Sequence, residues 1–173
     1  LEEGKARAGR SRNLARGRGS RLGHMLHYDV IAVGTDGSDG AQKAVRTAAS
    51  MARAYQAKLI IVTAFYTHHG GVFGAHSSET DKLPIVSEES AESYLDAAVK
   101  IAAEEGADKV EVIPKSGDPV HALMEVGEEH DVDVFVVGNR GINSLSGRVF
   151  GSVSTELMRK VHCDVVVVNT TQQ

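Results

Sequence analysis

One segment of the chain, residues 138–154, combines glycines and serines in an order that suits the binding of an anion. It begins where an apolar run ends and closes where a helical pattern starts. Glycine lets the backbone adopt conformations closed to other residues and approach a ligand closely. The start of a helix adds unpaired N–H groups and the positive end of the helix dipole. The pattern predicts phosphate binding by Gly138, Gly141, Gly151, Ser152 and Ser154, the two serines as hydroxyl donors.

The charges around this segment favour the same chemistry. No acidic residue occurs between Asp133 and Glu156, whereas Arg140 and Arg148 both fall within that interval. The whole chain is acidic, with a net charge of −4, whereas this interval carries only positive charges. The interval is therefore a local site for an anion. The alternative is an ordinary strand-to-helix connection, in which the glycines make turns and Ser152 only caps the helix.

Two aspartates, Asp36 and Asp39, follow the first apolar run, 30–35. A carboxylate at the end of a strand can accept hydrogen bonds from ribose hydroxyls or hold a divalent cation that bridges to phosphates. The alternative is capping of the helix that follows, for which Ser38 is also placed. Capping is the favoured interpretation for Asp39, and both interpretations stay open for Asp36.

Other sequence motifs exclude several classes of site. The chain has no Walker-type phosphate loop, no dinucleotide-binding glycine pattern and no nucleophile elbow. His68, His69 and His76 match no metal-site spacing and are expected to be solvated loop residues. Neighbouring residues in an extended strand point to opposite faces, so Cys163 and His162 are expected not to form a catalytic pair. Because no nucleophile is placed beside a base, we expect no efficient catalysis.

Strand-like and helical patterns alternate along the chain and must position these residues. The strand-like runs are 30–35, 58–66, 110–114, 133–137 and 164–169, and the helical patterns are 41–55, 87–105, 119–130 and 152–161. Parallel strands joined by right-handed helical crossovers predict an α/β fold, a five-stranded, doubly wound, Rossmann-like sheet with helices on both faces. Such a sheet binds ligands beyond the carboxyl ends of its strands, where the winding direction reverses.

Composition divides the chain into a basic leader, 1–24, and a single domain, 25–173. The leader holds seven of the 19 basic and two of the 23 acidic residues, which leaves 12 and 21, a net charge of −9, in the domain. We expect the leader to be flexible and added for expression before a native start at Met25, with a nucleic-acid-binding arm or a transit peptide as alternatives. The acidic domain argues against nucleic acid as a partner.

No apolar run reaches the roughly 20 residues of a membrane span. The single cysteine, Cys163, favours a reducing compartment, the cytoplasm.

The glycine spacing resembles the nucleotide-binding signature of the universal stress protein family, G-x2-G-x9-G-[ST]. Gly138, Gly141, Gly151 and Ser152 match its four positions. Asp36 matches an aspartate that the family carries at the end of its first strand, although Gly34 stands where many relatives have proline. The similarity extends from about residue 28 to residue 169.

This resemblance implies the ATP-binding subgroup of the family and a sheet of strand order 3-2-1-4-5. It implies that the signature residues and Ser154 hold phosphates, that Val153 adds its backbone, and that Asp36 lies near the ribose. Independently of the resemblance, the position of Asp36 makes it the candidate ligand for Mg²⁺ that bridges to the phosphates. The backbone of Ala64 would meet the adenine. The complete set of predicted nucleotide-binding residues is Gly34, Thr35, Asp36, Ala64, Val137, Gly138, Asn139, Arg140, Gly141, Arg148, Gly151, Ser152, Val153 and Ser154.

The resemblance also implies a homodimer formed through the last strand, 164–169. This run is apolar and lacks a protective charge, and pairing with its own copy would remove an edge that otherwise aggregates. The expected function is that of a stress-response regulator that binds ATP. The alternatives are a member that binds AMP or cyclic AMP, a slow Mg²⁺-dependent ATPase, and a protein-interaction module without a nucleotide. The protein partner cannot be named from the sequence.

Overall fold

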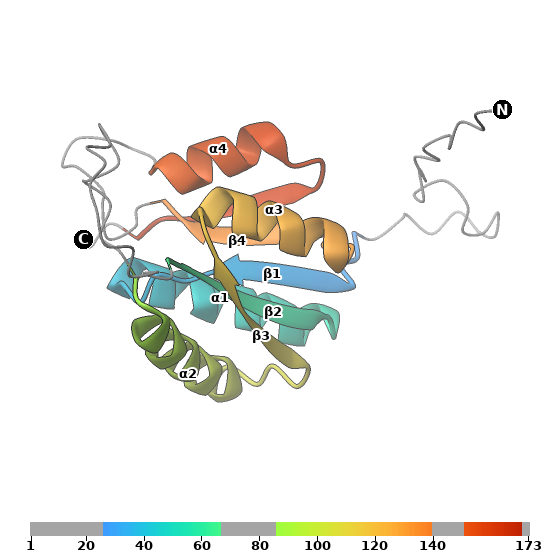
Figure 1. Ribbon diagram of the computed structural model, residues 1–173. Coiled ribbons are helices and arrows are strands. Elements are labelled where there is room, and N and C mark those ends of the chain that lie inside the picture. Colours follow the sequence, from blue (N-terminus) through green and yellow to red (C-terminus); the bar gives the residue numbers. More distant parts are fainter. Residues whose placement is uncertain (1–25, 67–85, 140–150, 171–173) are drawn as a thin grey trace, which may run out of the picture.

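The computed structural model describes residues 26–66, 86–139 and 151–170. The predicted leader and the three loop histidines lie outside these ranges, and so do Arg140, Gly141 and Arg148. Strands and helices alternate through the described residues (Figure 1). In chain order they are β1 (Val30–Gly34), α1 (Asp39–Tyr55), β2 (Lys58–Phe65), α2 (Glu88–Glu104), β3 (Val110–Ser116), α3 (Pro119–Glu129), β4 (Val134–Gly138), α4 (Ser152–Lys160) and β5 (Asp164–Val168).

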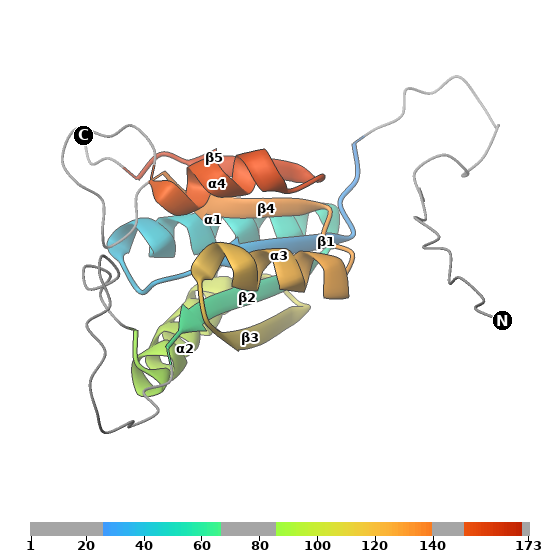
Figure 2. The ribbon, with the colours of Figure 1, turned by 45° about the horizontal axis from the view of Figure 1, so that its top comes forward.

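The five strands form one parallel sheet in the order β3-β2-β1-β4-β5, which confirms the predicted fold class and strand order. Strand β1 lies in the middle, with Val33 paired to Ile61 of β2 on one side and to Val136 of β4 on the other. Figure 2 shows β1 between these two neighbours. The chain winds outward from β1 in one direction and then in the other, so the winding reverses between β1 and β4.

Helices cover both faces of the sheet and divide its core in two. Figure 1 shows α1 and α2 on one face and α3 and α4 on the other. Alternate strand residues point to opposite faces, so Ile31 and Val33 pack under α1 and α2 whereas Ala32 packs under α3 and α4. These three residues have no exposed surface. Burial on both faces explains why the central strands are apolar without alternation.

Strand β3 is longer than predicted. The run 110–114 was expected to stop at its proline, but β3 continues through Pro114 to Ser116 and pairs with β2 along that length. Proline cannot donate a backbone hydrogen bond, and it is tolerated here because β3 lies at the edge of the sheet.

The helix starts are fixed by short polar side chains. Asp118 caps α3 as the Asp-Pro pair predicts, accepting hydrogen bonds from the N–H groups of Val120 and His121 at 3.0 Å each. The favoured interpretation of Asp39 as the cap of the first helix is wrong. Ser38 caps α1, and Asp39 is the first helical residue, where its charge faces the positive end of the dipole.

Two carboxylates fix the chain where it enters β1. Asp133 Oδ2 accepts hydrogen bonds from the backbone N–H groups of Asp29 at 2.7 Å and Val30 at 2.9 Å. The hydroxyl of the buried Tyr28 donates to Asp164 Oδ2 at 2.9 Å. Burial, and next the bond to this carboxylate, raise the pKa of Tyr28 to about 12. The start of β1 is thus joined to β5 across β4.

We expect the Tyr28→Phe variant to be about 1 kcal/mol less stable than the wild-type chain at neutral pH, the typical contribution of one hydrogen bond. The fold favours the neutral phenol, whose ordinary pKa is 10.0. The contribution is therefore complete below that pH and is lost as the pH rises to about 12. Urea unfolding of both chains, from neutral pH to about pH 12, measures the difference.

Tyr55→Phe is the control for this prediction. The Tyr55 ring lies edge-on to Tyr28 with a centroid distance of 5.0 Å, and its hydroxyl makes no hydrogen bond with any described residue. This variant should match the wild-type chain. A Tyr28→Phe chain of unchanged stability at neutral pH, or a deficit that persists at about pH 12, would contradict the assignment.

Candidate functional site

The predicted site residues that the structure describes gather at the carboxyl edge of the sheet, the edge at which Gly34 ends β1 and Gly138 ends β4. Thr35 and Asp36 follow the first of these strands, and Asn139 follows the second. The two strands are neighbours, so the residues after them lie side by side. Ala64 reaches the same edge from β2, on the far side of β1.

The backbone that leaves β1 is tied to β2 by buried contacts. The Thr35 N–H donates to the Val62 carbonyl at 2.9 Å, and the Thr63 hydroxyl donates to the Thr35 carbonyl at 3.0 Å. Thr35 and Thr63 are both buried. Both backbone polar groups of Thr35 are therefore satisfied within the protein, and the turn starts from a fixed point.

Asp36 shapes the turn that follows. Its Oδ1 accepts hydrogen bonds from the Ser38 N–H at 3.1 Å and from the Ser38 hydroxyl at 2.6 Å. The Ser38 hydroxyl oxygen in turn accepts the Ala41 N–H at 3.2 Å and caps α1. Asp36 thus acts on the helix start through Ser38, and the half-exposed carboxylate stays at the edge where a ribose contact is predicted.

Gly37 completes this turn and requires the absence of a side chain. Its φ of +77° is in the left-handed region, and a Cβ atom there would lie 2.4 Å from the ring of Tyr94 on α2. Tyr94 is partly buried on its helix, and the sequence gives no sign of this contact, which joins segments far apart in the chain.

The start of α4 provides hydrogen-bond donors at this edge. Gly151 is the N-cap residue, with φ −74° and ψ 167°, and it has no side chain to accept a hydrogen bond. Ser152, Val153 and Ser154 form the first turn, and their backbone N–H groups have no acceptor among the described residues. The alternative in which Ser152 caps the helix is wrong, because Ser152 is the first helical residue.

The side chains of this first turn differ in what they offer. Ser154 is buried, and its hydroxyl donates to the Gly151 carbonyl at 3.0 Å, so its proton is directed back into the helix. Ser152 is exposed. The donors that remain for an anion are three backbone N–H groups and the Ser152 hydroxyl, at the positive end of the helix dipole.

The side chains of Val137 and Asn139 are buried, which limits their access to a ligand. The Val137 side chain is buried in the core under α3 and α4. The Asn139 side chain is also buried and accepts hydrogen bonds from Thr170, beyond the end of β5. The sequence places Asn139 at the site but gives no indication that it faces the last strand.

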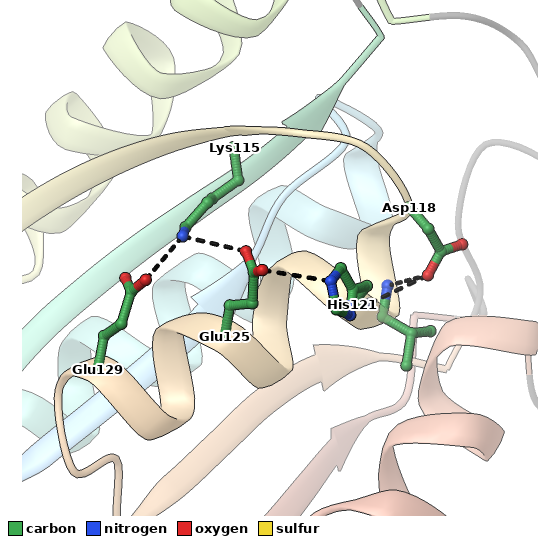
Figure 3. A network of polar contacts seen from close by, with 6 residues as sticks. Lys115, Asp118, His121, Glu125 and Glu129 are labelled. Carbon is green, nitrogen blue, oxygen red and sulfur yellow. Dashed lines mark hydrogen bonds and ion pairs between the residues drawn. The ribbon is translucent and has the colours of Figure 1, made fainter.

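A second polar cluster lies between β3 and α3 (Figure 3), and its Lys115 is paired with Ala64 near the end of β3. Lys115 Nζ lies 3.1 Å from Glu125 Oε2 and 3.0 Å from Glu129 Oε1, and Glu125 Oε1 lies 3.2 Å from His121 Nε2. Hydrogen bonds to Glu129 and Glu125 raise the pKa of Lys115. The cluster ties an edge strand to a helix and is partly exposed, so its energetic contribution is small.

The described residues hold no group of three or more histidine, cysteine or carboxylate side chains able to bind a metal ion. Cys163 is partly buried against the core under α3 and α4, and this burial raises the pKa of its thiol, as expected for an unreactive cysteine. Within the same ranges, no helix is long and apolar enough to cross a bilayer.

Comparison with known proteins gives consistent matches over the folded part of the chain. The sequence model of the Universal stress protein family matches residues 27–169. A universal stress protein of Mycobacterium tuberculosis H37Rv is 37% identical over 147 residues, which are 85% of this chain and 100% of the relative.

Solved structures give the same result. The crystal structure of a universal stress protein in complex with cAMP is similar with a TM-score of 0.65 and 34% identity, over 84% of this chain and 100% of the other. The crystal structure of a Mycobacterium tuberculosis H37Rv protein has a TM-score of 0.55 and 36% identity, over 85% and 99%.

The contact between Gly37 and Tyr94 gives a prediction that a matched glycine controls. Gly106 has a nearly identical φ of +79°, but a Cβ atom there would meet only the flexible Arg53 side chain, at 3.2 Å. We expect Gly106→Ala to lower the free energy of unfolding by about 1 kcal/mol because of its φ alone. Gly37→Ala should lower it by about 1–3 kcal/mol more because of the added crowding. Urea unfolding of both variants measures the two losses, and equal losses would show that the Tyr94 contact has no effect.

Proposed function

The chain belongs to the universal stress protein family, and on that premise we propose that it is a stress-response regulator that binds an adenine nucleotide at the carboxyl edge. The observation that carries the proposal is the first turn of α4, where three backbone N–H groups have no acceptor among the described residues. A phosphate group would satisfy these donors and would be favoured by the helix dipole.

Comparison among the helix starts supports this assignment. The other described helices, α1, α2 and α3, are capped by the side chains of Ser38, Ser87 and Asp118. A glycine at the same position in α4 leaves its donors available and leaves space for a ligand to approach the backbone. The site therefore favours an anionic ligand that none of the described residues supplies.

The sheet order supports an orientation for the nucleotide. The predicted contacts for adenine, ribose and phosphate are Ala64, Asp36 and Ser152, respectively. Ala64 lies near the end of β2, Asp36 follows β1, and Ser152 begins the helix after β4. These strands are adjacent in the order β2-β1-β4, so the three contacts follow one another across about 10 Å of sheet, at about 4.8 Å per strand. That is the order of base, sugar and phosphate within a nucleotide.

ATP is the nucleotide that the complete G-x2-G-x9-G-[ST] signature favours. In that case Gly141, Arg140 and Arg148 would add contacts to the phosphates. Asp36 would hold Mg²⁺, which binds through one or two carboxylates together with the phosphates of its nucleotide. Cyclic AMP is a second candidate, because a universal stress protein 34% identical to this chain was solved in complex with it.

The proposal includes a location in the cytoplasm, which is in keeping with the single cysteine. It also includes a dimer. Strand β5 is at the edge of the sheet and pairs only with β4 among the described strands. The Asp164 N–H and the Val168 carbonyl bond toward β4. Because these directions alternate along a strand, Val165 and Val167 point their backbone groups outward. Pairing with a second copy of β5 would satisfy those groups.

The nucleotide site is tested by replacing the glycine cap. We expect Gly151→Asp to raise the free energy of unfolding by a few tenths of a kcal/mol without nucleotide, because aspartate is a slightly better N-cap than glycine at this backbone conformation. The same change should weaken ATP binding at least about tenfold, because the carboxylate takes the N–H groups and repels phosphate. Thermal unfolding and isothermal titration with ATP, with and without Mg²⁺, and with cyclic AMP measure both effects.

Gly151→Asn separates the two causes in this experiment. Asparagine caps the helix without a charge, so it should stabilise similarly and weaken binding less than aspartate does. Unchanged ATP and cyclic AMP affinity in Gly151→Asp would place the nucleotide elsewhere. A wild-type chain that binds neither nucleotide would refute the proposed function and favour a protein-interaction module.

The dimer is tested at the outward-facing backbone of β5. We expect Val167→Pro to convert the dimer to a monomer while the pairing of β5 with β4 persists, because proline removes an N–H that points away from β4. Val167→Ala keeps that N–H and should remain dimeric. Light scattering at micromolar concentration gives the mass of each species. A monomeric wild-type chain would refute the dimer.

A further inference from the structure

Asn139 is bonded to two separate segments at the point where β4 ends, residue 151 and residues 168–170. Only 8% of its surface is exposed. Its backbone N–H donates to the Val168 carbonyl at 2.8 Å, and its carbonyl accepts the Gly151 N–H at 2.6 Å. Its side-chain Oδ1 accepts both the backbone N–H of Thr170 at 2.9 Å and the Thr170 hydroxyl at 2.6 Å. Its Nδ2 donates to Asn169 Oδ1 at 3.4 Å.

The backbone of Asn139 locates the start of α4. Gly151 is the N-cap of that helix, and its N–H is held by the Asn139 carbonyl. The three N–H groups of the first turn, which have no acceptor among the described residues, follow Gly151 directly, so their position relative to β4 depends on this bond. A small displacement of Asn139 would move the donors that a phosphate needs.

The side chain of Asn139 holds the end of β5 instead of facing a ligand. Its oxygen already accepts two hydrogen bonds from Thr170, and its amide nitrogen is directed to Asn169. A carboxamide oxygen has two lone pairs, so no acceptor capacity is left for ribose or water. These bonds favour an indirect role for Asn139 over the direct nucleotide contact predicted from the sequence.

We propose that Asn139 is a positioning residue that couples nucleotide occupancy at the start of α4 to the carboxyl end of β5, an inference that rests on the proposed function. Its backbone carbonyl binds Gly151 and so fixes the position of the N–H donors, and its side chain binds Thr170 and so fixes the end of β5. Binding free energies are reciprocal, so a nucleotide that prefers this arrangement stabilises the β5 end by the same factor by which an ordered β5 end strengthens nucleotide binding.

Thr170 provides the test, because it bonds Asn139 but contributes no donor to the first turn of α4. Thr170→Val removes the hydroxyl with little change of shape, and Thr170→Ser retains it. We expect Thr170→Val to weaken ATP binding about fivefold, at the lower end of ordinary coupling between sites, and Thr170→Ser to bind as the wild-type chain does. Isothermal titration with ATP measures the affinities.

Hydrogen exchange gives a readout that a merely structural role would not move. In the wild-type chain, ATP should slow exchange of the Thr170 backbone amide, whose acceptor is Asn139 Oδ1. In Asn139→Ala that acceptor is absent, so ATP should no longer slow the Thr170 amide, and affinity should fall at least as far as in Thr170→Val.

The outcomes separate this inference from the function on which it rests. If the wild-type chain binds ATP or cyclic AMP and Thr170→Val binds it with unchanged affinity, the coupling is refuted and the proposed function stands. A lower melting temperature in Thr170→Val with unchanged affinity would also refute it, because the bond would then be structural only. A wild-type chain that binds neither nucleotide refutes both proposals. If Asn139→Ala does not fold, the Thr170 pair decides alone.

Discussion

Three backbone N–H groups at the start of α4 are the feature around which the carboxyl edge is organised. A helix cannot satisfy them from within, and Gly151 supplies no side chain to do so. The sheet determines where they lie, since α4 starts beside the point at which the winding reverses. Most of the surrounding contacts hold the backbone of this edge in place, and no described residue accepts a hydrogen bond from these three N–H groups.

The support for this site is internal to the protein. Thr63 and Val62 hold Thr35, and Ser38 binds Asp36. The ring of Tyr94 packs where Gly37 has no side chain. These contacts use buried or half-buried groups from β2, α1 and α2, so the turn after β1 has its shape before any ligand arrives. Such preorganisation lowers the entropy lost on binding.

Much of the fold could be predicted from the sequence, because its central strands are apolar on both faces and its helices carry apolar stripes. The strand order needed the family resemblance, since hydrophobic pattern does not say which strands are neighbours. Local rules failed where position in the sheet decided the outcome: β3 passes through Pro114 because it is an edge strand. The glycines of the site were visible in the sequence. The inward direction of Ser154 and the bonds of Asn139 to Thr170 were not, because they depend on contacts made only after folding.

The short hydrogen bond between Asn139 and Gly151 has an evolutionary consequence. These two residues flank 140–150, and the bond fixes the separation of both anchor points independently of what lies between them. Substitutions in the intervening residues can therefore occur without shifting the scaffold on which they are mounted. A lineage could alter the proposed ligand contacts of that stretch while the sheet and α4 are inherited intact.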